Sequence, residues 1–523
     1  MKQISGINLL VYKPKGNKKY CNDDITKFLK KYKLNEALRL IGELSYNILR
    51  NNNANPVINL HGVPVSDSLL AYLTMNIIEC SNDYRKEILS TNDIAKIADM
   101  YYGLPDPFVE DANLDEFLLR FGSAQFDYDR EINNIVPRTF LIYCRLWNDV
   151  EKANEIDINA AAVQKITKLN IDNLIVFAYA FLGACIKGFF RLYDENKISI
   201  EKDKPLFTEE KQRSFIDWIS CSYQEFRIES LKINNELPSK DFEKNRFNLL
   251  IKHPIIKPDR NPRPDLKQVY LVPITRLLLE RVTHGLYFDL SDFFQKPGKS
   301  NKFREAFGHV FQEYVGYIIK QSHCDINLLN EWRYYRDQKS TVDWIIIEGN
   351  KAVFIEVKQT GLFLQAKTLG NTKDVQENLT KSISKAAQQL WLFEQDIKSG
   401  KHKELADLSN IEEIERLVVT YDRTYYSNSI LKKYAHDIAI QGIQNFPEQY
   451  DWHIISIEEL EHILAINNIS LFNFLRTKRN NEESRELDFR EYIARKYPQP
   501  IYINPYLENV KKEFLNYVNN TID

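Results

Sequence analysis

Apolar residues recur every three to four positions through much of the first half of the chain, which is the spacing of one buried helix face. Clusters of Asn, Asp, Ser and Pro separate these stretches. No phosphate-binding loop or dinucleotide-binding motif occurs among them. We therefore predict that residues 1–250 form a mainly α-helical region of unassigned role, with helices over Ala37–Arg50, Asp67–Ile78, Asp93–Tyr102 and Ile171–Phe190.

A group of prolines ends this pattern. Proline lacks a backbone N–H group and holds the residue before it in an extended conformation, so it interrupts regular structure. Residues 251–282 are therefore predicted to form a connector between two domains. Lys and Arg side chains in the same stretch suit a phosphate backbone, although a solvated connector explains them equally well. The prolines are Pro254, Pro258, Pro262, Pro264 and Pro273.

The remaining residues, 283–523, mix helical and strand patterns. Two runs rich in Ile, Val and Phe, Thr341–Glu348 and Lys351–Lys358, flank Gly349-Asn350, a dipeptide that favours a two-residue hairpin turn. The order of elements predicts an α/β core, with a central mixed sheet flanked by helices. The other predicted elements are helices over Phe303–Ile319, Ser382–Ile397 and Glu458–Leu464, and strands over Asn327–Arg336, Leu417–Tyr421 and Trp452–Ile457.

The predicted hairpin places charged residues in an apolar setting. If Gly349-Asn350 is the turn, Asp343 lies directly across from Glu356, and Lys358 follows two residues later on the same face. Like charges opposed across two strands destabilise a sheet. A cation bound by both carboxylates would remove this conflict, and carboxylate oxygens suit Mg²⁺ or Mn²⁺. The alternative is a solvent-exposed strand face on which Lys358 pairs with the acids.

This pattern resembles the PD-(D/E)XK, or restriction-endonuclease-like, nuclease superfamily. The resemblance rests on Asp343 and on the run Phe354-Ile-Glu-Val-Lys358, and it covers about residues 283–464. It implies that Asp343 and Glu356 bind the metal and that Lys358 assists the attacking water. Val342 stands where the family often has proline.

The flanking helices extend the resemblance. The sequence around Phe307–Val315 is similar to the first core helix of the family, which implies that Glu313 is a third metal ligand and part of the catalytic site. The helix around Lys385–Leu390 is similar to the one after the motif, which implies that Gln389 faces the active site.

The resemblance implies a Mg²⁺-dependent endonuclease that hydrolyses phosphodiester bonds, with Mn²⁺ as a substitute and DNA favoured over RNA as substrate. A helical region fused to such a nuclease resembles bacterial antiphage defence proteins, in which the extra region binds a trigger, a protein partner or another copy of the chain. Two alternatives stay open. One is a nucleic-acid-binding or regulatory protein with a catalytically silent nuclease fold, and the other is a helical interaction scaffold.

Composition limits these readings only weakly. The chain has 70 Lys and Arg against 72 Asp and Glu, so the molecule as a whole does not attract phosphate. Its six cysteines have no metal-binding spacing, and no apolar run reaches the length of a membrane span. We expect a cytoplasmic protein without membrane contacts. The mixed charges of Lys478–Glu486 are typical of a solvated surface.

Overall fold

The computed structural model describes most of the chain. Residues 261–268 of the predicted connector, with Pro262 and Pro264, lie outside the described residues. The described residues are 20–50, 57–104, 132–187, 192–194, 208–235, 246–260, 269–322, 326–359, 381–423, 427–466, 468–497 and 503–522.

The four helices predicted in the first half are present as α2 (Leu34–Arg50), α3 (Asp67–Cys80), α4 (Thr91–Tyr102) and α11 (Ile171–Lys187). Serine caps fix two of their starts, because the hydroxyls of Ser66 and Ser90 accept N–H groups of the first turns of α3 and α4. The other helices here are α1 (Asn22–Leu29), α7 (Ile132–Phe140), α8 (Trp147–Asp149), α9 (Glu151–Asn154), α10 (Gln164–Thr167), α12 (Glu209–Ile219) and α13 (Tyr223–Asn235), with π-helical turns at Leu141–Leu146 and Asn159–Val163.

This half also contains strands that the helical pattern did not predict. A hairpin joins β1 (Val57–Leu60) to β2 (Val63–Ser66). A second sheet has the order β3-β6-β5-β4 and takes two of its strands from the predicted connector. The domain boundaries stay predictions. The strands are β3 (Leu192–Asp194), β4 (Ser220–Ser222), β5 (Ile255–Lys257) and β6 (Val269–Leu271), followed by α14 (Leu277–Val282) and α15 (His284–Phe294).

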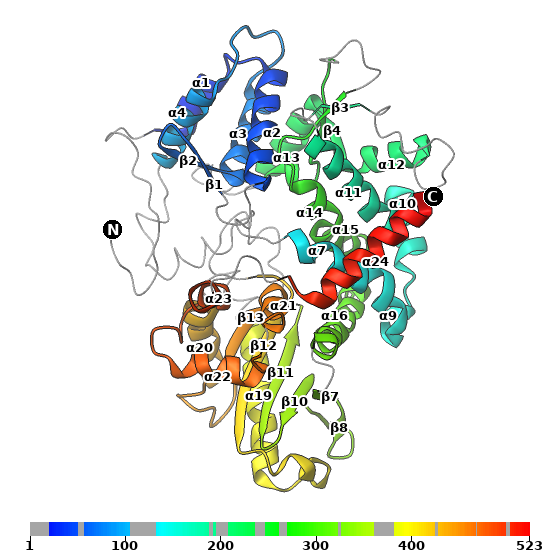
Figure 1. Ribbon diagram of the computed structural model, residues 1–523, viewed down its shortest axis with the longest axis vertical. Helices are drawn as coiled ribbons and strands as arrows, with labels where there is room; N and C mark the ends of the chain where they lie inside the picture. The colour runs from blue at the N-terminus through cyan, green and yellow to red at the C-terminus, as the bar shows by residue number, and fades with distance from the viewer. Residues whose placement is uncertain are drawn as a thin grey trace.

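The second half contains the predicted mixed sheet, in the order β13-β12-β11-β10-β7 (Figure 1). Strand β10 pairs antiparallel with both β7 and β11, whereas β12 pairs parallel with both β11 and β13. The strands are β7 (Asn327–Asn330), β10 (Trp344–Glu348), β11 (Lys351–Lys358), β12 (Glu413–Thr420) and β13 (His453–Ser456), and a separate hairpin pairs β8 (Arg333–Tyr334) with β9 (Lys339–Ser340).

Helices cover both faces of this sheet. Ile346 and Val353 pack in one core with α16 (Lys302–Ser322), α21 (Ile457–Leu464) and α22 (Leu471–Asn480). Ile345 and Phe354 point the other way, into a core with α19 (Lys381–Ser399) and α20 (Lys432–Gly442). The alternation follows from the two-residue period of a strand. Helices α23 (Phe489–Lys496) and α24 (Pro505–Ile522) follow.

Helix α16 also packs against the helices of the first half. The rings of Trp147 and Phe303 stack with centroids 5.6 Å apart, and Tyr143 lies 5.9 Å from Phe307. One apolar core therefore continues from these N-terminal helices through α16 into the sheet. Across the described ranges, no helix has the length and apolar character needed to cross a membrane.

Candidate active site

The hairpin between β10 and β11 has the predicted register. Trp344 pairs with Ile355 and Glu348 with Lys351 around the turn at Gly349. Next to the pair Trp344–Ile355, on the side away from the turn, Asp343 lies opposite Glu356. The Asp343 carboxylate is anchored there, because its Oδ2 accepts the backbone N–H of Val357 at 2.6 Å.

Four of the five predicted site residues meet at the end of β11. Glu356 is only 1% exposed, in the apolar strand that forms the centre of the sheet. The Lys358 ammonium donates to Glu356 Oε2 at 2.7 Å and to Gln389 Oε1 at 2.9 Å. Gln389 comes from α19, on the same face of the sheet. The alternative of a solvent-exposed acidic face does not fit the burial of Glu356.

Among the described residues, the site holds more negative charge than Lys358 balances. Burial, and then the charge of Asp343, raise the pKa of Glu356 to about 8. Burial raises the pKa of Asp343 to about 6, against the opposing effects of Lys358 and the Val357 N–H group. Burial disfavours the charged form of Lys358, but both carboxylates reverse this effect and raise its pKa. A further cation would stabilise the ionised form of both acids.

Glu313 is not part of this cluster. It lies on α16, which covers the other face of the sheet, and much of its surface is exposed. Partial burial raises its pKa, and none of the described carboxylates contributes to that shift. Its assignment as a third metal ligand stays a prediction without support from the geometry.

A different acid, Glu331, lies closer to the pair and was missed in the sequence. Trp344 pairs with Asn330 of the antiparallel strand β7. Glu331, which follows Asn330, therefore lies opposite Asp343, which precedes Trp344. The charge of Glu331 adds to the rise in pKa of both Asp343 and Glu356. The β8–β9 hairpin separates Glu331 from Asp343 along the chain, so no short turn reveals this pairing.

The donor set fits a cation that takes few protein ligands. Within the described part of the chain, no group of three or more His, Cys, Asp or Glu side chains is arranged to hold a metal ion. Mg²⁺ is commonly bound by one or two carboxylates and completes its shell with water and substrate phosphate oxygens. Asp343 and Glu356 match this requirement, and the unbalanced charge supplies the driving force.

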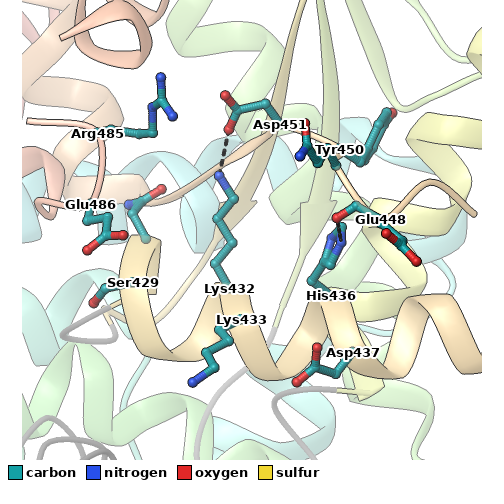
Figure 2. A pocket seen from close by; sticks show the side chains of 12 residues that line it. Ser429, Lys432, Lys433, His436, Asp437, Glu448, Tyr450, Asp451, Arg485 and Glu486 are labelled. Atoms are coloured by element: carbon teal, nitrogen blue, oxygen red, sulfur yellow. Dashed lines mark hydrogen bonds and ion pairs between the residues drawn. The ribbon is translucent and has the colours of Figure 1, made fainter. Parts of the chain in front are cut away.

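A pocket of about 580 Å³ lies elsewhere, over α20 and the segments before β13 and after α22 (Figure 2). None of the predicted site residues lines it. Its charges are partly neutralised, since Lys432 pairs with Asp451 at 2.8 Å and the His436 ring lies 2.9 Å from the carbonyl oxygen of Glu448. This pocket does not share the charge imbalance of the cluster on β11.

Comparison with known proteins does not add a relative: no family model, no curated protein and no solved structure matches this chain.

Proposed function

We propose that this protein is a metal-dependent nuclease of the PD-(D/E)XK type that hydrolyses phosphodiester bonds in DNA. The observation that carries the proposal is the meeting of Asp343, Glu356, Lys358 and Gln389 at the end of β11. A buried and a half-buried acid beside one lysine form a site that favours a divalent cation and an attacking water near a phosphate.

Each residue has a distinct role in this proposal. Asp343 and Glu356 would hold Mg²⁺, or Mn²⁺ in its place, which would supply a Lewis acid for a phosphoryl oxygen. Lys358 orients the attacking water and donates to phosphate oxygens as negative charge develops on them. Gln389 accepts from the Lys358 ammonium and so keeps it at the end of the strand. Burial of the cluster strengthens each of these electrostatic contacts.

The direct test is incubation of the full chain with plasmid, linear duplex and single-stranded DNA, with Mg²⁺ or Mn²⁺. We expect cleavage that excess chelator stops and that Glu356→Ala removes while the protein stays folded. The exposed Glu404→Ala, in the 3₁₀ helix Lys403–Leu408, is the matched control and should cleave normally. Cleavage that persists in chelator would contradict the metal-dependent mechanism.

The same experiment separates the nuclease from a silent nuclease-like fold. A binding or regulatory protein would retain DNA without metal and give no products from any substrate. An RNA substrate in parallel tests the preference for DNA. A role in bacterial antiphage defence is part of the proposal only through its architecture, a helical region fused to a nuclease core.

A further inference from the structure

Two basic side chains, Lys152 and His309, lie in contact with each other. Lys152 of α9 and His309 of α16 come from two helices that pack side by side (Figure 1). The Lys152 Nζ lies 3.1 Å from the His309 Nε2. Because an ammonium can only donate, this contact requires a neutral imidazole and leaves two N–H groups of Lys152 for another acceptor.

No acid neutralises this pair in the described structure. Neither Lys152 nor His309 forms an ion pair with a described Asp or Glu. Burial and then the Lys152 charge lower the pKa of His309, while the charges of Glu331 and Glu305 act in the opposite direction. Lys152 is exposed, so its charge is open to an anion from solvent. An anion bound between the two side chains would stabilise both.

The basic pair is linked to the acids through α16 and Glu331. One turn after His309, the side chain of Gln312 donates to Glu331 Oε2 at 3.3 Å. The Gln312 carbonyl oxygen also accepts the indole N–H of Trp344, the residue after Asp343, at 2.8 Å. Glu331 therefore acts electrostatically on both His309 and Asp343. A Cβ on Gly308, the residue before His309, would lie 3.5 Å from the side chain of Gln359, which follows Lys358, so this part of α16 lies at the end of β11.

We propose that Lys152 and His309 form a phosphate-binding subsite that holds the DNA backbone beside the catalytic cluster. The inference rests on the proposed nuclease function and deepens it, because it assigns a substrate contact to the N-terminal helical half. The ligand is a backbone phosphate, so the subsite contributes affinity and position without reading sequence. His309 can add a charge of its own when it takes up a proton beside the bound phosphate.

The test measures binding of a fluorescent duplex to the full chain carrying Asp343→Asn, which prevents cleavage, over a series of salt concentrations. One lost phosphate contact should weaken binding about tenfold at 0.1 M salt and reduce the salt slope by about 0.9. We expect this result for Lys152→Gln. The exposed Lys165→Gln, on α10 in the same half, is the control and should change neither quantity.

A double-mutant cycle with His309→Gln distinguishes a phosphate held by both side chains from a non-specific electrostatic attraction of the DNA. If both side chains hold one phosphate, the double variant should bind more tightly than the product of the single effects predicts. Additive losses, or equal losses for Lys152→Gln and Lys165→Gln, would overturn the subsite.

The two proposals can fail separately. If the chain with Asp343 intact cleaves DNA and Lys152→Gln leaves affinity, salt slope and KM unchanged, the subsite is wrong and the nuclease stands. If the salt slope falls as expected but the intact chain gives no products, the subsite stands and the nuclease is wrong. In a cleaving enzyme, the subsite predicts a raised KM with kcat unchanged for Lys152→Gln, because the contact is made before the reaction.

Discussion

Two pairs of acids lie in the second half of the chain, each with a buried member, and they differ in how far their charges are balanced. Glu461 of α21 is fully buried, but Arg138 of α7 donates to both of its oxygens at 2.7 Å and Tyr314 donates to one of them at 2.7 Å. Its neighbour Glu458 lies 3.4 Å from the same guanidinium. Among the described residues, Asp343 and Glu356 share one lysine, Lys358, which donates a hydrogen bond to Glu356.

The difference shows that burial of carboxylates does not by itself mark a functional site. Around Glu461 the donors are complete, and the cluster ties α7 to α16 and α21. Within the described ranges, Lys358 is the one charged donor to Glu356, so the acids resist ionisation unless a further cation binds. Charge left unbalanced by the fold is therefore the feature that separates the candidate site from a structural ion pair.

The largest expected effect removes the charge that the candidate site uses. Lys358→Ala should lower the cleavage rate by about 10²–10⁴-fold, because the site loses a group that orients water and stabilises developing negative charge. Lys351→Ala, at the other end of β11, should retain activity. Initial rates on a plasmid substrate measure both. Equal rates for the two variants would place the chemistry elsewhere.

Loss of the ion pair between Arg138 and Glu461 should instead lower the stability of the protein. Arg138→Met leaves Glu461 buried without its main partner and should cost about 3–5 kcal/mol of unfolding free energy. Arg145→Met removes an exposed pair with Glu513 and should cost about 0–1 kcal/mol. Denaturant unfolding of both variants measures the difference. Similar losses would mean that the Arg138 cluster is less important for folding than its contacts indicate.

Titration of Glu356 should make the metal-free protein less stable as pH rises. Its pKa is about 8 in the folded chain against an ordinary value of 4.5, so the unfolded chain loses this proton first. Stability should fall between these two values by about 1.4 kcal/mol per pH unit.

Glu356→Gln should flatten this decline, whereas the exposed Glu404→Gln should not. Melting temperatures at pH 6, 7 and 8 check the slope. Mg²⁺ should raise the melting temperature more at pH 8 than at pH 6, because binding requires ionised acids. A Mg²⁺ effect that is the same for Glu356→Gln would argue against this metal site.

The smallest expected effect tests the packing that supports Asp343. A Cβ on Gly316 of α16 would lie 2.1 Å from the Trp344 ring, so Gly316→Ala must displace the residue next to Asp343. Overpacking of this kind costs about 1–3 kcal/mol, reduced by the better helix propensity of alanine. We also expect lower cleavage activity.

Gly308 on the same helix is the matched control. A Cβ there would lie 3.5 Å from the Gln359 side chain, which is ordinary contact. Gly308→Ala should therefore be neutral or stabilising. If Gly316→Ala is equally harmless, the contact between Trp344 and α16 does not position the site.

The parts of the fold that depend on local patterns could be predicted from the sequence. The two-residue turn at Gly349-Asn350 determined the register of β10 and β11, and with it the meeting of Asp343 and Glu356. Long amphipathic helices such as α16 were equally readable. The three-residue strands of the first half were not, because three residues are too few to show a two-residue period.

Contacts between segments far apart in the sequence could not be predicted from local patterns. Glu331 joins the site through strand pairing across an inserted hairpin, and Lys152 approaches His309 only because two helices pack together. The prediction for Lys478 as part of a solvated surface was wrong. Its side chain is buried, donates to the carbonyl oxygen of Arg485 at 2.9 Å, and has a pKa that burial lowers to about 7.

Helix α16 packs against both the N-terminal helices and the sheet, so the two halves of the chain share one core. One end of this helix holds the rings of Phe303 and Phe307 against Trp147 and Tyr143, while the space at Gly316 accommodates the ring of Trp344, the residue after Asp343. A fragment that begins at residue 283 would keep the sheet but leave an aromatic flank of α16 bare. The first half could therefore be exchanged by recombination only for a segment whose aromatic rings cover the same face of α16.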